Sequence, residues 1–183
     1  CGNYFWFFLL TWLPSYLVKE RGYSIEGMAA VGSAAYLTIA AATIAAGWIS
    51  DRLIRRGASL TRVRRTVAAG GLACSTVILP VAVVESRTAA IVLLLLSCAA
   101  FGTYTSNHWA MTQTLAGPRA AGRWTSLQNG VGNLSGIAAA WFTGFVVQTT
   151  GRFYLAFLTA SAVALLGAAL WRITVRELKE VQW

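Results

Sequence analysis

Long runs of apolar residues, separated by short polar connections, fill most of the 183-residue chain. Each run has about the length, roughly 20 residues, that a helix needs to cross the hydrocarbon core of a bilayer. Backbone polar groups find no water in that core, and runs such as 89–100 do not alternate as barrel strands do, so helices are expected. The six predicted membrane-spanning helices cover residues 2–18, 27–49, 66–84, 89–114, 125–148 and 153–172.

The composition agrees with a membrane protein. Hydrophobic residues make up 57% of the chain and charged residues only 11%, whereas soluble domains carry about 25% charged residues. The predicted fold class is therefore an all-α membrane protein built as a six-helix bundle. The three cysteines, Cys1, Cys74 and Cys98, do not have the spacing of a metal or redox site, so no metal or cofactor is expected.

The net charge of +9 does not indicate nucleic-acid binding, because the basic residues lie between the apolar runs. Eleven of them fall in the predicted basic loop 50–65, in the loop 115–124, or at Arg172 and in the tail 173–183, and four fall in the opposite connections. Basic residues gather on the cytoplasmic side of membrane proteins. We therefore expect a multi-pass protein of the cell membrane with both chain ends cytoplasmic. Because residue 1 is Cys rather than Met, and residues 3–10 already belong to an apolar run without a basic leader, the chain is expected to start inside a larger protein.

A distinctive short motif follows the second apolar run. Residues 47–57 read GWISDRLIRRG, which has the spacing G-x-x-x-D-R-x-x-R-R. An ordinary basic loop explains the arginines alone but not the whole spacing. The glycine allows close helix approach, and the aspartate one turn later can pair with an arginine or with a helix N-terminus. The residues of this motif are Gly47, Asp51, Arg52, Arg55 and Arg56.

Two amides and several small residues form one stripe on the fifth predicted helix. At about 100° per residue, Asn129, Gly132, Asn133 and Gly136 share this stripe. Amides are poorly tolerated against lipid, so the stripe is expected to face a neighbouring helix or a water-filled cavity. We expect Gly132 and Gly136 to pack against a helix. Asn129, with Asn133, is expected to bind substrate.

The fourth predicted helix carries Ser106, Trp109 and Gln113 on one face. A tryptophan ring beside hydroxyl and amide groups is typical of a site for a sugar-like ligand, although tryptophan also occurs in the interfacial aromatic belt. On the first helix, Tyr4 is a candidate cavity residue, although an aromatic packing surface explains this helix equally well. His108, the only histidine, lies away from the polar face and is expected to have a structural role.

No carboxylate lies in the middle of a predicted helix, where proton-coupled transporters usually keep one. All six acidic residues lie at helix ends or in connections, and no Lys or Arg lies at mid-membrane to meet an anionic substrate. If the protein is a symporter, these groups are expected in a half that is missing from this chain.

The order of the motifs resembles helices seven to twelve of the anion:cation symporter family of the major facilitator superfamily. The resembling segments are 11–22 (TWLPSYLVKERG), 47–57, 107–110 (NHWA), 115–122 (LAGPRAAG), 127–137 (LQNGVGNLSGI) and 143–153 (TGFVVQTTGRF). Members carry sugar acids such as hexonates, hexuronates, glucarate and galactonate. The resemblance implies the C-terminal six-helix bundle of a major facilitator fold, formed by two inverted three-helix repeats.

The resemblance also implies a site. In sugar-acid members, a serine and a tryptophan three residues apart on helix ten contact substrate, together with an asparagine on helix eleven. Ser106, Trp109 and Asn129 match these positions. The motif at 47–57 is then expected to latch the closed state at the cytoplasmic face. The expected partners are a small organic anion, protons, the lipid bilayer and a missing N-terminal bundle that holds the anion-binding arginine and the proton-carrying acids.

The two alternatives to this function are an intramembrane enzyme and a self-associating half-transporter. An intramembrane enzyme of the six-helix serine protease type needs a nucleophilic serine and a histidine on facing helices. His108 instead lies opposite Ser106 on the same predicted helix. The other alternative is a half-transporter that self-associates. The sequence favours a proton-coupled transporter that works by alternating access, so the chain is not expected to be an enzyme.

Overall fold

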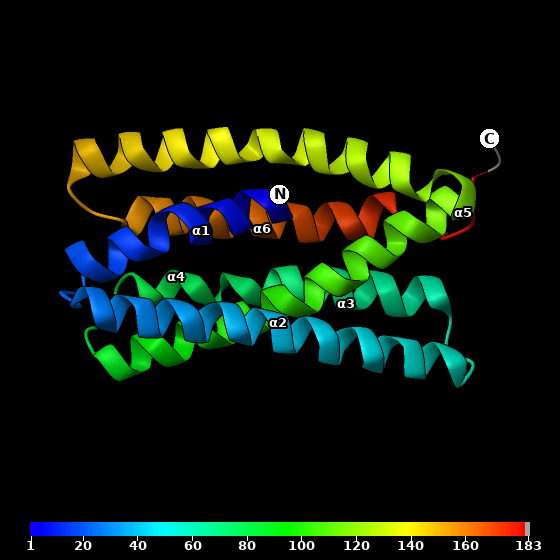
Figure 1. Cartoon of the computed structure of the whole chain (residues 1–183), viewed down its shortest axis with the longest axis horizontal. Coiled ribbons are helices and arrows are strands. Elements are labelled where there is room, and N and C mark those ends of the chain that lie inside the picture. The colour runs from blue at the N-terminus through cyan, green and yellow to red at the C-terminus, as the bar shows by residue number, and fades with distance from the viewer. Residues whose placement is uncertain (182–183) are drawn as a thin grey trace.

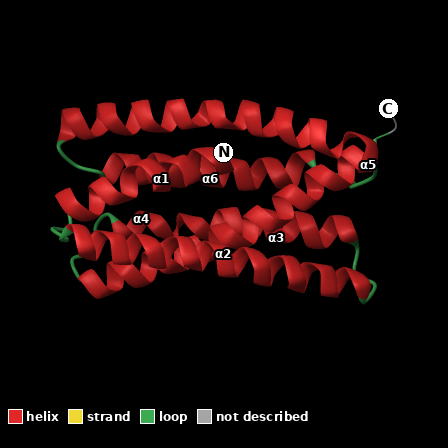
Figure 2. Ribbon diagram, in the orientation of Figure 1, coloured by secondary structure: helices red, strands yellow, loops and turns green. Residues whose placement is uncertain are grey.

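The computed structural model describes residues 1–181, and almost all of this part of the chain is helical. Figures 1 and 2 show the helices lying along one common direction in an elongated bundle. Residues 182–183, the end of the predicted tail, lie outside the described residues. The elements are α1 (Gly2–Lys19), α2 (Ile25–Arg55), α3 (Leu60–Cys74), the short helix η1 (Ser75–Val77), α4 (Ile78–Val81), α5 (Arg87–Thr150) and α6 (Tyr154–Thr174).

Helix α5 has 64 residues and is broken once, at Gly117. The φ of 67° and ψ of 171° at this residue are not helical, and glycine is the residue that adopts a positive φ without a steric penalty. Pro118 follows, and a proline both lacks an N–H and pushes the preceding residue out of the helical region. The break separates a first arm, residues 87–116, from a second arm, residues 118–150. Figure 1 shows the second arm returning along the bundle in the opposite direction.

The predicted all-helical architecture is confirmed for residues 1–181, in which no strand occurs. Three helices, α2, α5 and α6, are long and apolar enough to cross a membrane. The number of membrane-spanning helices, predicted as six, stays a prediction.

The connections are shorter than the sequence suggested. The basic segment 50–65, expected to be a loop, is mostly helical, because α2 continues to Arg55 and α3 begins at Leu60. Arginine is a good helix former, and the Ser59 hydroxyl caps α3 by accepting a hydrogen bond from the Arg62 N–H at 3.4 Å. The predicted loop 115–124 is likewise helical except at the break. Polar residues therefore extend the helices beyond the apolar runs.

Aromatic side chains hold α1 against the rest of the bundle. Phe5 and Phe8 are almost fully buried. Their rings lie 5.0 Å, between centroids, from those of Phe101 on the first arm and Phe157 on α6. These contacts fix the rotation of α1, and that rotation decides which of its polar residues face α5.

Candidate functional site

Two cavities, with volumes of about 250 Å³ and about 300 Å³, lie where α1 meets both arms of α5. Both are lined by Asn3 of α1, by Tyr104, His108 and Trp109 of the first arm, and by Asn129 of the second arm. Because α1 begins near the middle of the bundle (Figure 1), these cavities lie away from its two ends. Aromatic walls with a few convergent amides are typical of sites for small polar ligands.

Three of the residues predicted to bind substrate lie together at these cavities. Trp109 and Asn129 line both of them, and Asn133 lines the smaller one. The indole comes from the first arm and the two amides from the second, so the break at Gly117 brings them face to face. Asn129 and Asn133 are exposed, which leaves their amide groups open to a ligand.

Tyr4, Ser106 and Gln113 are not among the residues that line these two cavities. Tyr4 points into the core, where it is 8% exposed, and Asn3 faces the cavities in its place. Gln113 is exposed near the end of the first arm. Ser106 packs toward α2, since a Cβ built on Gly47 would lie 3.6 Å from the Ser106 Cβ. Periodicity along one helix does not reveal which neighbour each face meets.

His108 lines both cavities, although the sequence suggested only a structural role. Its ring does pack closely, at centroid distances of 5.2 Å from Tyr104, 4.9 Å from Trp109 and 5.6 Å from Trp171 of α6. Its Nδ1 atom is buried without a hydrogen-bond partner among the described residues. The ring is thus held in place by packing, while its Nδ1 atom makes no hydrogen bond to the described residues.

The other ring nitrogen of His108 contacts a residue that the sequence did not single out. Nε2 lies 2.9 Å from the Nε2 atom of Gln128 on the second arm. The Thr112 hydroxyl of the first arm donates to Oε1 of the same glutamine at 2.6 Å. Gln128 directly precedes Asn129, so it also orients the turn that carries the cavity amide.

The glycines of the second arm lie against α1. A Cβ on Gly132 would come within 2.5 Å of the Asn3 amide nitrogen, and a Cβ on Gly136 within 2.9 Å of the Phe7 ring. Such close approach requires residues without a side chain. The two glycines therefore set the distance between α1 and the second arm at the cavity.

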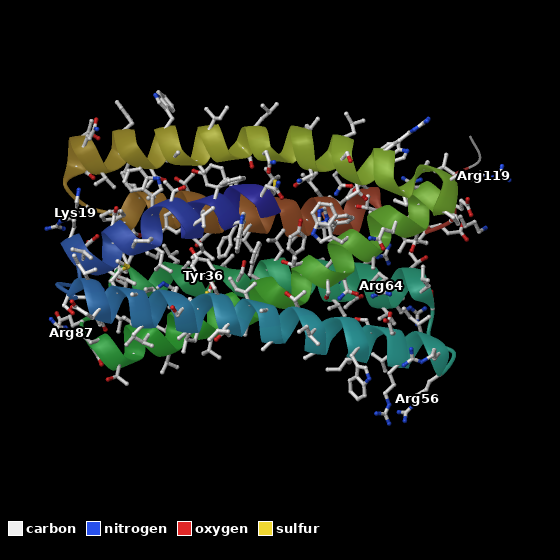
Figure 3. All side chains as sticks on the ribbon, in the orientation of Figure 1. Lys19, Tyr36, Arg56, Arg64, Arg87 and Arg119 are labelled. Carbon is white, nitrogen blue, oxygen red and sulfur yellow. The ribbon has the colours of Figure 1, made fainter. Side chains whose placement is uncertain are left out.

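The motif at 47–57 lies at the far end of α2. Its exposed arginines point outward, as Figure 3 shows for Arg56, and Arg52 lies over the ring of Trp48 with 5.2 Å between the guanidinium carbon and the ring centroid. Asp51, with its side chain 48% exposed, accepts a hydrogen bond of 2.6 Å from Arg64 of α3. Figure 3 shows Arg64 inside the bundle. The aspartate thus ties α2 to α3.

Residues 1–140 match the Major Facilitator Superfamily. The chain belongs to this superfamily. Since superfamily members are membrane transporters and the helices are apolar, this is an integral membrane protein. The predicted membership is confirmed.

Several relatives within the Major Facilitator Superfamily are named as transporters of sugar acids. The chain is 32% identical over 177 residues to the D-galactonate transporter of Escherichia coli O6:H1, covering 96% of this chain and 40% of that protein. It is also 32% identical over 166 residues to the hexuronate transporter of Bacillus subtilis, covering 88% of this chain and 39% of that protein. A probable galactarate/D-glucarate transporter of Bacillus subtilis is 33% identical over 163 residues, covering 86% of this chain and 35% of that protein. The chain thus spans about two fifths of the length of these relatives.

Proposed function

We propose that this chain is the C-terminal half of a secondary transporter that moves sugar acids or similar organic anions across the cell membrane. Transport would proceed by proton symport and alternating access, with both chain ends in the cytoplasm. The six membrane-spanning segments would be α1, α2, α3 with η1 and α4, the two arms of α5, and α6. Substrate would bind between this bundle and an N-terminal bundle.

The observation that carries this proposal is the meeting of Trp109 with Asn129 and Asn133 across the two arms of α5. An indole face suits the C–H groups of a sugar acid, and amides bond its hydroxyl groups as donors and as acceptors. Relatives named for galactonate, hexuronates and glucarate support the same ligand class.

No Lys, Arg, Asp or Glu is among the described residues that line the two cavities. The carboxylate of the substrate and the coupled proton therefore have no ionised partner on this side. In the proposal, the N-terminal bundle supplies both the cation that binds the carboxylate and the acid that carries the proton.

A hydrolytic enzyme receives no support from the surroundings of His108. Catalysis of the serine protease type requires a serine hydroxyl hydrogen-bonded to the imidazole. Among the described residues, the polar contact of the His108 ring is with the Gln128 amide. The transporter is therefore the function we propose.

Uptake of radiolabelled sugar acids by cells that express the complete transporter tests the proposal. We expect saturable uptake of at least one of D-galactonate, a hexuronate and D-glucarate. Trp109→Ala and Asn129→Ala should each reduce it by about tenfold or more, since each removes a direct polar or apolar contact with the ligand. Thr114→Ala is the control, because among residues 1–181 this hydroxyl bonds only the Ala110 carbonyl of its own helix. No uptake of any of the three acids would contradict the function, and normal uptake by both variants would contradict the site.

A further inference from the structure

We infer that Asn107 is a positioning residue that couples the cytoplasmic motif to the substrate cavity. The inference rests on the proposed transport function and assigns a task to a residue that does not line the two cavities. In the structure Asn107 is fully buried and hydrogen-bonded to a second helix.

The coupling consists of hydrogen bonds in series across α2, α3 and the first arm. Arg64 donates through Nη2 to the Asp51 carboxylate at 2.6 Å and through Nη1 to the Asn107 Oδ1 atom at 3.2 Å. The Nδ2 atom of Asn107 donates in turn to the Ser106 hydroxyl and to the Thr103 carbonyl, both at 3.2 Å. One guanidinium group thus joins the aspartate of the motif to the turn of helix that precedes Trp109.

Burial makes this arrangement specific. Asn107 is 0% exposed, and the Arg64 side chain is 12% exposed. A buried amide or guanidinium group is costly unless it is hydrogen-bonded, and an apolar residue at position 107 would leave the Arg64 Nη1 group without this acceptor. Both Nδ2 hydrogens and the Oδ1 atom of Asn107 have partners. The side chain is therefore held in one orientation.

The position of Asn107 on the first arm explains how the coupling reaches the site. His108 and Trp109, which line both cavities, are the next two residues of the same helix. Ser106, on the other side, packs against Gly47 of the motif. A shift of the cytoplasmic end of α2 therefore moves Asp51, and Arg64 transmits this shift to the turn that holds the cavity side chains.

The competing explanation is that these hydrogen bonds only stabilise the packing of α2, α3 and the first arm. It predicts less folded protein after substitution, but unchanged turnover of the molecules that still bind substrate. Coupling predicts slower turnover of those molecules. It also predicts that substitutions at positions 51 and 107 are not additive, because each breaks the same chain of contacts.

The experiment uses the complete transporter in proteoliposomes, with uptake normalised to the number of molecules that bind substrate. We expect Asn107→Ala and Asp51→Asn each to lower turnover about tenfold, as for loss of a hydrogen bond to a charged group. The dissociation constant should change less than about threefold, because neither residue touches the ligand. The turnover rate of the double variant should lie within about twofold of the rate of either single variant. Thr114→Ala on the same arm serves as the control and should turn over at the wild-type rate.

A second pair of variants keeps the test informative if Asn107→Ala does not fold. In Asp51→Asn, Arg64 loses the carboxylate on α2, whereas Asp51→Glu keeps a carboxylate on the same helix for the guanidinium group. Asp51→Glu should turn over at least about fivefold faster than Asp51→Asn, since the ion pair between α2 and Arg64 is kept. Equal turnover of the two variants would overturn the inference.

The outcomes separate this inference from the proposed function. Failure of the wild-type protein to bind or transport any sugar acid contradicts the function itself. Normal wild-type transport with additive losses of about a hundredfold in the double variant overturns the coupling alone. Normal turnover of Asn107→Ala overturns it as well.

Discussion

The Nε2 atom of His108 lies 2.9 Å from the Nε2 atom of Gln128, and both residues line the larger cavity. The two residues are 20 positions apart in the chain, on opposite sides of the break at Gly117. The hydrogen bond of 2.6 Å from the Thr112 hydroxyl to Gln128 is a second contact between the two arms. The wall of the cavity is thus fixed by one amide that touches both a ring nitrogen and a hydroxyl of the opposite arm.

The first prediction concerns Gln128. Gln128→Ala removes both contacts with the first arm, so His108 and the neighbouring Asn129 lose their common support. We expect the KM for the sugar acid to rise about three- to tenfold, the loss expected for one or two hydrogen bonds. Ser126→Ala is the matched control, because this exposed hydroxyl bonds the Gly122 carbonyl of its own helix and no other group in the described part of the chain. An unchanged KM in Gln128→Ala would show that the contact between the arms does not shape the site.

The second prediction concerns packing at the cavity. In Gly136→Ala the new Cβ meets the Phe7 ring at 2.9 Å, a contact that requires a shift of α1. We expect a loss of about 1–3 kcal/mol in the free energy of unfolding, as for other overpacked sites. Gly130→Ala on the same arm has open space around its Cβ and should be neutral or slightly stabilising, because alanine favours helix. Thermal unfolding in detergent compares the two variants, and equal midpoints would contradict the close packing.

The third prediction concerns the break in α5. Gly117→Ala places a side chain at a φ of 67° and into the Glu180 side chain of the C-terminal tail. We expect destabilisation of about 1–3 kcal/mol from this backbone conformation alone, which is essentially restricted to glycine, with the clash added. Gly122→Ala has no neighbour within 4 Å and should tolerate the substitution. Fluorescence-detected size exclusion on both variants measures the folded fraction. If both remain equally folded, the reversal of α5 does not depend on the glycine.

The sequence predicted the helical architecture because lipid leaves a backbone few alternatives. Apolar runs of membrane-spanning length therefore indicate helices directly. They did not predict the helix ends, since α2 and α3 continue through the arginines of 50–65 and reduce the expected loop to a short turn. The length of a helix outside the bilayer depends on helix propensity and capping, and a hydropathy pattern reports neither of these.

The candidate site could be predicted only in part. Periodicity along single helices identified Trp109, Asn129 and Asn133, all of which line a cavity. It did not predict that Asn3 rather than Tyr4 faces the cavity, because the rotation of α1 is fixed by its packing against α5 and α6. The role of Asn107 was equally inaccessible, since its partner Arg64 lies 43 residues earlier in the chain.

Equilibrium binding of sugar acids to the purified complete transporter tests the central claim most directly. Isothermal titration with D-galactonate, a hexuronate and D-glucarate should give a saturable dissociation constant for at least one of them. Asn129→Ala and Trp109→Ala should weaken that binding about tenfold or more while the protein stays folded, since both side chains are proposed to contact the ligand. Undiminished binding by both folded variants would contradict the account.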